Sequence, residues 1–227
     1  MTEADVLKLA AGERALELVR DGMLVGLGTG TTASLFVEGL GRRVAAGLHV
    51  ACLATSARTA RLAAASGIPL VEEIDRPLDL AVDGADEIDP RRNLLKGRGG
   101  ALFREKLVAL NAERFVVVAD SGKLVDQLGA GVVPVEVLPF LWRRTAAELA
   151  ALGAEWALRQ DRGQPYVTDN GNLILDLTFA DRIRDPVGLA AAIKGIPGVL
   201  EHGLFLGIAV GCIVAGADGI QILGRLD

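Results

Sequence analysis

The chain has 227 residues, of which 51% are hydrophobic and only 4% aromatic, and its formal net charge is −5. This length fits one large domain or one domain with a smaller partner, and the apolar content excludes a disordered chain. The acidic charge and the scarcity of aromatic residues disfavour a nucleic-acid-binding protein. Cys52 and Cys212 are isolated cysteines, which predicts a reduced, cytosolic protein and disfavours a structural zinc site.

No segment of the sequence is expected to enter a membrane. The longest uncharged apolar stretch, residues 203–217, is shorter than the roughly 20 residues that a membrane-spanning helix needs. The N-terminus is acidic and polar, so we expect no signal peptide. Thr2 instead suits the N-cap of an ordinary first helix.

Strand and helix signals alternate in the first half of the chain. Strands are predicted at residues 23–27, 50–54, 78–82 and 115–119, with a weaker one at 70–71. Helices are predicted at residues 33–46, 56–66 and 99–110. This alternation predicts a parallel sheet with both faces covered by helices.

The pattern changes near Gly129-Ala-Gly131. Strands are predicted at residues 133–138 and 156–159, helices at 142–152 and 186–193, and a hairpin around Asn170-Gly171 within residues 166–179. This predicts a small α+β domain over residues 131–204. The apolar tail from Leu204 is expected to form buried strands that return to the first sheet, so the first domain comprises residues 1–130 and 205–227.

A glycine-rich loop, Gly26-Leu-Gly-Thr-Gly-Thr-Thr32, follows the first predicted strand and precedes a helix. The backbone N–H groups of such a loop and the positive end of the helix dipole bind anions. Thr31 occupies the position of the third glycine in the dinucleotide motif, and the loop lacks the lysine of a nucleoside-triphosphate site. We therefore expect a small phosphate here; the alternative is a tight strand–helix turn with no ligand.

Two aspartates, Asp83 and Asp86, follow the strand predicted at 78–82, within Asp83-Gly-Ala-Asp-Glu-Ile-Asp89. Ligands of open α/β sheets lie beyond the carboxyl ends of the strands, so both aspartates are predicted to face a crevice. Paired carboxylates orient hydroxyl groups, bind Mg²⁺ or transfer protons. The alternative is a solvated acidic turn that caps a helix.

A second glycine-rich loop, Lys96-Gly-Arg-Gly-Gly100, carries basic residues and leads into a helix that contains Arg104-Glu-Lys106. It suits an anion, or an oxyanion that develops during a reaction. Apolar neighbours one turn away indicate that Glu105 is partly buried, which suits a general base. Arg104 and Lys106 also have apolar neighbours, so the spacing alone does not distinguish Glu105 from a structural residue.

Lys123, in Asp120-Ser-Gly-Lys123, follows the next strand, either as a further crevice lysine or as part of a helix cap. His49 and His202 lack a nearby nucleophile pattern, so a hydrolase triad is unsupported. The loops together offer two anion sites, a carboxylate pair and two lysines. This combination predicts an enzyme that acts on a small, polyhydroxylated, anionic molecule.

These segments occur in the order seen in the type A family of ribose-5-phosphate isomerases, which the chain resembles over nearly its whole length. The resemblance also includes Thr168-Asp-Asn-Gly-Asn172 and Gly203-Leu-Phe-Leu-Gly207. It implies a Rossmann-like parallel-sheet domain with a smaller ferredoxin-like α+β domain inserted before the C-terminal strands. It also implies a cytoplasmic homodimer or homotetramer, with the small domain expected to mediate assembly.

The activity implied by the resemblance is the interconversion of D-ribose 5-phosphate and D-ribulose 5-phosphate in the non-oxidative pentose phosphate pathway. The family needs no metal or organic cofactor, and no nucleic acid or membrane partner is implied. Glu105 matches its proton acceptor. Its substrate-binding segments match Thr29, Gly30, Thr31 and Thr32, then Asp83, Gly84, Ala85 and Asp86, then Lys96, Gly97, Arg98 and Gly99, and finally Lys123.

The implied mechanism begins with opening of the sugar ring, assisted by Asp83 or Asp86. Glu105 then moves the proton from C2 to C1 through an enediolate. Lys96 stabilises the charge that develops on oxygen, and Lys123 helps to hold the ligand.

Three positions depart from the family pattern. Arg98 replaces a common glycine, Gly122 replaces a more usual serine, and residues 209–212 lack an acidic residue often found there. None of these is Glu105 or an active-site aspartate, so we expect activity to survive.

Two other functions stay open. One is a sugar-phosphate sensor, which would not need Glu105. The other is a different enzyme on the same scaffold, such as an amino-sugar phosphate deaminase or a CoA transferase.

Overall fold

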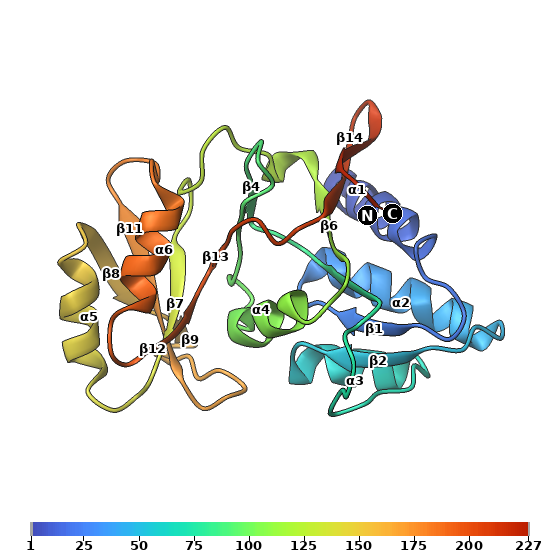
Figure 1. The fold of residues 1–227 in the computed structure, drawn as a ribbon, viewed down its shortest axis with the longest axis horizontal. Coiled ribbons are helices and arrows are strands. Elements are labelled where there is room, and N and C mark those ends of the chain that lie inside the picture. The colour runs from blue at the N-terminus through green and yellow to red at the C-terminus, as the bar shows by residue number, and fades with distance from the viewer. Residues whose placement is uncertain (1, 227) are drawn as a thin grey trace. The chain divides into compact units, whose positions relative to one another are not determined.

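A computed structural model describes residues 2–226, which divide into two compact units (Figure 1). Unit 1 comprises Met1–Ala85, Arg104–Lys123 and Gly207–Asp227, and unit 2 comprises Asp86–Phe103 and Leu124–Leu206. Unit 2 therefore contains all of the small domain predicted over 131–204, together with residues 86–103, 124–130 and 205–206. Within the added segments, Leu94–Leu95 pairs with Leu204–Phe205 on one side and with Glu87–Ile88 on the other.

Unit 1 is built on a six-stranded sheet in the order β15-β14-β6-β3-β1-β2. Its strands are β1 (Leu24–Leu27), β2 (Ala51–Ala54), β3 (Leu80–Asp83), β6 (Phe115–Asp120), β14 (Gly211–Gly216) and β15 (Gly219–Gly224). All neighbouring pairs are parallel except β14 with β15. The predicted Rossmann-like sheet is confirmed, and the carboxyl ends of β1, β3 and β6 lie next to one another in it.

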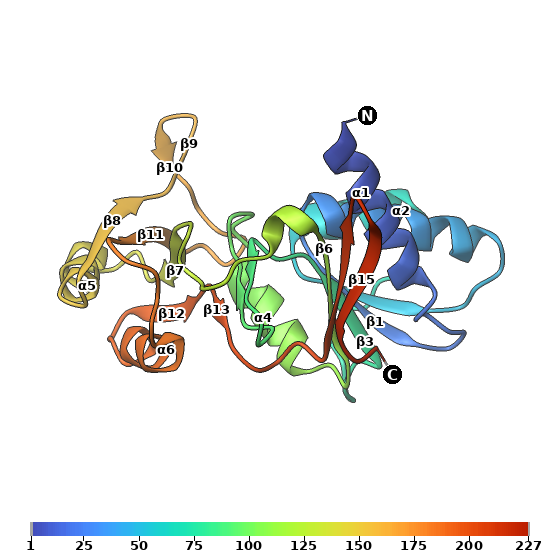
Figure 2. The ribbon, with the colours of Figure 1, turned by 90° about the horizontal axis from the view of Figure 1, so that it is seen from above.

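Helices cover both faces of this sheet, as predicted. They are α1 (Glu3–Leu16), α2 (Thr31–Ala45), α3 (Ala57–Ala65) and α4 (Leu102–Leu110). Val25 and Leu27 of β1 share a core with Ala11 of α1 and Phe36 of α2, so these two helices cover the same face of the sheet. Both helices are labelled in Figure 2. Gly26 points to the opposite face because strand residues alternate, and a Cβ there would lie 2.5 Å from Val108 of α4.

Unit 2 contains a four-stranded antiparallel sheet in the order β12-β7-β11-β8. Along the chain, its elements are β7 (Val133–Val137), α5 (Trp142–Ala150), β8 (Ala154–Leu158), β11 (Leu173–Phe179), α6 (Pro186–Lys194) and β12 (Val199–His202). This βαββαβ order confirms the predicted ferredoxin-like arrangement. Val135 and Leu175 pack with Leu149 of α5 and Ile193 of α6, so both helices cover one face of the sheet.

Shorter elements complete the chain. They are β4 (Glu87–Ile88), β5 (Leu94–Leu95), β9 (Gln160–Asp161), β10 (Gln164–Pro165), β13 (Leu204–Phe205) and the 3₁₀ helix η1 (Ser121–Lys123). Strands β9 and β10 form a ribbon that projects from unit 2 in Figure 2. No helix within residues 2–226 combines the length and apolar character needed to cross a membrane.

Two predictions about the C-terminal tail are wrong. Leu204 and Phe205 were expected in the first sheet, but they pair with Leu95 and Leu94 in a separate three-stranded sheet. The final strand, β15, was expected to be buried, but most of its residues are exposed. β15 is an edge strand, which pairs with β14 alone among the strands of residues 2–226, so an apolar sequence there does not require burial.

The hairpin predicted within residues 166–179 forms only in part. Leu173–Phe179 is a strand, but the preceding arm contributes only an isolated bridge from Val167 to Leu173. The side chains of Thr168, Asn170 and Asn172 donate hydrogen bonds to Glu136 Oε1, at 2.9, 3.0 and 2.9 Å. These bonds to a buried carboxylate organise the turn in place of a longer ladder.

Candidate active site

The glycine-rich loop of unit 1 links β1 to α2 and leaves the start of that helix open. Gly30, the N-cap of α2, has φ +126°, and no side chain caps the first turn. The amides of the first turn therefore remain available to an anion, which the helix dipole also favours. Thr31 is exposed at this end, whereas Thr32 is buried.

Thr29 lies inside the loop and is buried. Its hydroxyl oxygen lies 2.8 Å from Thr55 Oγ1, 2.7 Å from Ser56 Oγ and 3.0 Å from Thr59 Oγ1. Thr59 Oγ1 in turn donates to the carbonyl of Gly28 at 3.0 Å. The Thr29 side chain thus fixes the loop from within, a function that the sequence motif did not indicate.

Asp83 ends strand β3 directly beside this loop, and it is buried. Its Oδ1 accepts hydrogen bonds from the backbone N–H groups of Thr29, at 3.1 Å, and Gly84, at 2.7 Å. A Cβ on Gly28 would lie only 2.2 Å from the same oxygen. Only glycine at position 28 leaves space for this carboxylate, so the position of Asp83 depends on the sequence of the glycine-rich loop.

Glu105 and Lys123 are two further predicted site residues of unit 1. Glu105 lies in the first turn of α4 and is only 3% exposed, so the burial expected from its apolar neighbours is confirmed. Lys106 is also buried, so burial alone does not distinguish the two residues. Lys123 ends η1, immediately after β6, and is half-buried.

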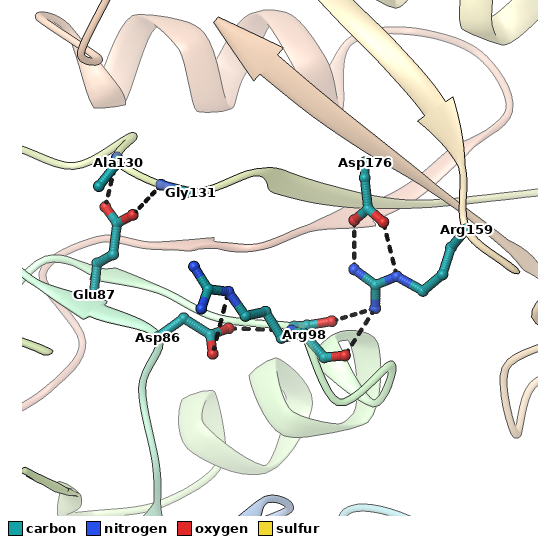
Figure 3. Close-up of polar contacts among 8 residues, drawn as sticks. Asp86, Glu87, Arg98, Ala130, Gly131, Arg159 and Asp176 are labelled. Carbon is teal, nitrogen blue, oxygen red and sulfur yellow. Dashed lines mark hydrogen bonds and ion pairs between the residues drawn. The ribbon is translucent and has the colours of Figure 1, made fainter. Parts of the chain in front are cut away.

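Unit 2 carries Asp86 and the loop 96–100. The backbone N–H of Arg98 donates to Asp86 Oδ2 at 3.1 Å, and Arg98 Nε lies 3.9 Å from Asp86 Oδ1 (Figure 3). The Arg98 side chain is half exposed, so this unusual residue places a positive charge beside Asp86. Lys96 is buried, with Nζ 5.5 Å from the centroid of the Phe205 ring, within reach of a cation–π interaction.

Three residues around this loop were missed by the sequence analysis. Glu87 accepts hydrogen bonds from the backbone N–H groups of Ala130 and Gly131 (Figure 3), and a further one from the N–H of Gly129. Arg159 pairs with Asp176 and also contacts the loop 96–100. Because these partners lie far apart in the chain, no local spacing could identify them.

Tyr166 lies against the end of the same loop. A Cβ on Gly100, whose φ is +80°, would lie 2.2 Å from the Tyr166 hydroxyl oxygen. Burial raises the pKa of Tyr166, so it contributes a neutral phenol here. Residues 2–226 contain no group of three His, Cys, Asp or Glu side chains arranged to bind a metal ion.

Known proteins resemble this chain closely. A family model described as ribose 5-phosphate isomerase A (phosphoriboisomerase A) matches residues 51–219. Ribose-5-phosphate isomerase A of Gloeobacter violaceus is 52% identical over 225 residues, covering 97% of each chain. That of Roseiflexus castenholzii is 54% identical over 215 residues, covering 92% of each.

Solved structures agree with these sequence relatives. Ribose 5-phosphate isomerase A from Methanocaldococcus jannaschii has a TM-score of 0.93 at 39% identity, covering 98% of this chain and 100% of that chain. A D-ribose-5-phosphate isomerase solved in complex with phospho-erythronic acid has a TM-score of 0.94 at 39% identity, with coverage of 99% and 100%.

Proposed function

The chain belongs to the ribose 5-phosphate isomerase A family and interconverts D-ribose 5-phosphate and D-ribulose 5-phosphate through an enediolate, and we propose here which residues carry out each step. The assignment of this activity rests on the match over nearly the full length to relatives that are all named ribose-5-phosphate isomerase A. The reaction belongs to the non-oxidative pentose phosphate pathway.

Ring opening is the first step, because the sugar is mostly cyclic and its C1 aldehyde must be released. A proton leaves the C1 hydroxyl and another reaches the ring oxygen. Asp83 or Asp86 assists this movement. Support comes from the bonds that fix both carboxylates: Asp83 Oδ1 accepts two backbone N–H groups, and Asp86 Oδ2 accepts one. A carboxylate held in one orientation is suited to transfer a proton to or from a substrate group beside it.

Glu105 removes the C2 proton of the open aldose. The electron pair of the C–H bond forms the C1–C2 double bond of the enediolate and leaves negative charge on O1. The O2 hydroxyl proton passes to O1, and as the electrons of O2 form the C2 carbonyl of the ketose, the same carboxyl group returns its proton to C1. The burial of Glu105 supports this role, because water does not compete with the substrate for a buried base.

Lys96 stabilises the oxygen charge of the enediolate, since a buried ammonium group acts strongly on charge that develops nearby. The open N-terminus of α2, with Thr29, Gly30, Thr31 and Thr32, is proposed to bind the phosphate group. Gly84, Ala85, Gly97, Arg98, Gly99 and Lys123 complete the proposed substrate-binding set.

Phospho-erythronic acid supplies a test ligand for this scheme. It is the molecule bound in one of the related structures, and it combines a phosphate with a carboxylate on a four-carbon chain. A carboxylate next to a hydroxyl-bearing carbon resembles the negative end of an enediolate. We therefore expect it to inhibit this enzyme competitively against ribose 5-phosphate.

The proposed chemistry is tested by incubating the protein with ribose 5-phosphate in deuterated buffer with a chelator, and following the products by NMR. Ribulose 5-phosphate with some deuterium at C1 is expected, because a carboxyl base exchanges its proton with solvent between the two transfers. Unphosphorylated ribose serves as the control and should react far more slowly. Absence of ketose from folded protein would refute the activity, and loss of activity with the chelator would refute metal-free catalysis.

We also propose a cytoplasmic location and assembly into a homodimer or homotetramer, mediated by the small α+β domain. The family resemblance supports both proposals. Size-exclusion chromatography with light scattering would test the second, and a monomer at micromolar concentration would contradict it.

A further inference from the structure

The loop 96–100 of unit 2 is tied to an arginine from a distant part of the chain. Arg159 Nη1 donates hydrogen bonds to the backbone carbonyl of Gly97, at 2.7 Å, and to that of Arg98, at 3.2 Å (Figure 3). These are the two residues directly after Lys96. A single guanidinium nitrogen therefore contacts two consecutive peptide groups of the loop.

Arg159 is itself fixed by Asp176 of β11. Its Nε donates to Asp176 Oδ2 at 3.0 Å and its Nη2 donates to Asp176 Oδ1, a two-bond pair (Figure 3). The two side chains are only 12% and 18% exposed. Bidentate, shielded pairs of this kind are stronger and better defined than single surface contacts. By comparison, Arg144 and Glu148 of α5 form a pair that is 75% and 40% exposed.

The backbone around Arg159 extends this anchor to both ends of the loop. Arg159 N–H donates to the carbonyl of Ile174 at 2.9 Å, which joins it to β11. The Arg159 carbonyl accepts the N–H of Tyr166 at 2.9 Å, and Tyr166 packs against Gly100. The start and the end of the loop thus contact the two ends of one short segment, residues 159–166, which contains the β9–β10 ribbon.

We propose that Arg159, oriented by Asp176, is a positioning residue for catalysis: it fixes the carbonyls of Gly97 and Arg98 and thereby places Lys96. This inference rests on the proposed function, in which Lys96 stabilises the enediolate. The fork of donors in arginine is essential to the role. Lysine keeps the charge but cannot join a carboxylate and two carbonyls in this geometry.

Arg159→Lys is the main test, with Arg144→Lys as the matched control on an exposed pair of the same unit. We expect kcat to fall about 10- to 100-fold in Arg159→Lys, the size of effect that follows loss of a charge-assisted hydrogen bond. KM should change less than kcat, because Lys96 acts mainly on charge that develops in the reaction. The control should keep kcat within about twofold, as expected for a weak surface pair.

Chemical rescue separates positioning from a general loss of structure. Ethylguanidinium matches the part of the arginine side chain that is missing in Arg159→Ala. It should restore kcat in folded Arg159→Ala, whereas ethylammonium, which lacks the fork of donors, should not. Equal rescue by both compounds would overturn the proposal, as would normal kcat in folded Arg159→Lys.

Hydrogen exchange of the amides at residues 97–100 gives a readout that needs no turnover. Exchange should be faster in Arg159→Lys than in wild type and unchanged in Arg144→Lys. Unchanged exchange in both variants would contradict the claim that Arg159 fixes the loop 96–100. Wild-type protein that turns over no ribose 5-phosphate would remove the proposed function itself. Normal wild-type turnover with an unaffected Arg159→Lys would overturn only the role of Arg159.

Discussion

Replacing Gly28 by alanine tests whether the glycine-rich loop and Asp83 form one unit. The added Cβ would lie 2.2 Å from Asp83 Oδ1, 2.3 Å from its Cγ and 2.5 Å from its Cα. All three distances are far below van der Waals contact, and the Cα belongs to the backbone of β3. A rotation of the Asp83 side chain cannot relieve the clash, so the loop and strand must separate.

The size of the effect follows from this geometry. Overpacking of a buried site costs about 1–3 kcal/mol, and a clash with backbone belongs at the upper end. For a protein of this length, about 3 kcal/mol lowers Tm by about 6–12 °C. Separation also lengthens the bond from Thr29 N–H to Asp83 Oδ1, now 3.1 Å, so kcat/KM should fall as well.

Thermal unfolding by circular dichroism measures the first effect, and steady-state turnover of ribose 5-phosphate measures the second. Gly84→Ala is the control for stability, because the nearest atom to its Cβ would be the carbonyl oxygen of Val118 at 3.8 Å, an ordinary contact. Its Tm should stay within about 2 °C of wild type. A Gly28→Ala protein as stable and active as wild type would refute the coupling.

Three further predictions concern unit 1. The hydrogen bonds from Arg76 and from the Leu24 N–H lower the pKa of Asp79 in the folded protein below its usual value of 3.8. These bonds therefore stabilise the fold fully above pH 3.8, and the stabilisation is lost as the pH falls through the lowered pKa of folded Asp79. Asp79→Asn should therefore lower the free energy of unfolding, measured in urea at pH 7, by about 1–3 kcal/mol. An equally large difference from wild type in the free energy of unfolding at pH 2 would contradict this. Burial raises the pKa of Cys52 to about 12, so a thiol reagent at pH 8 should label it only after denaturation; labelling of the folded protein would show otherwise. Thr29→Val should cost about 1–3 kcal/mol in urea unfolding because it leaves buried hydroxyl partners unpaired, and an unchanged midpoint would disprove that network.

The parallel sheet could be predicted because its signals are local. Short apolar runs that end in glycine or aspartate marked β1, β3 and β6, and the loops after them carry the candidate residues. Helix α4 was also found, but its predicted start at residue 99 is wrong by three positions. Gly100 has φ +80°, outside the helical region, so α4 begins only at Leu102.

The partners of buried polar groups could not be predicted from the sequence. Asn170-Gly171 is a strong hairpin signal, yet the turn there is set by Glu136, more than 30 residues earlier in the chain. Arg159 and Asp176 likewise carry no motif of their own. Their contacts depend on how the strands of the small sheet align, which a local pattern does not encode.

The roles of the threonines in the first glycine-rich loop also needed the structure. The sequence pattern treats Thr29 and Thr31 alike, as donors to a phosphate. The Thr29 side chain is buried among other hydroxyls, whereas Thr31 is exposed at the start of α2. Only the burial of each residue separates a donor that faces inward from one that is open to an anion.

The most direct test of the proposed catalysis is the turnover of ribose 5-phosphate by Glu105→Gln, compared with Glu113→Gln, an exposed glutamate. Loss of the general base should lower kcat by about 10²- to 10⁴-fold, while phospho-erythronic acid still binds within a few-fold of wild type. Glu113→Gln should be unaffected. Near-normal turnover in a folded Glu105→Gln protein would contradict the assignment of Glu105 as the residue that moves the proton.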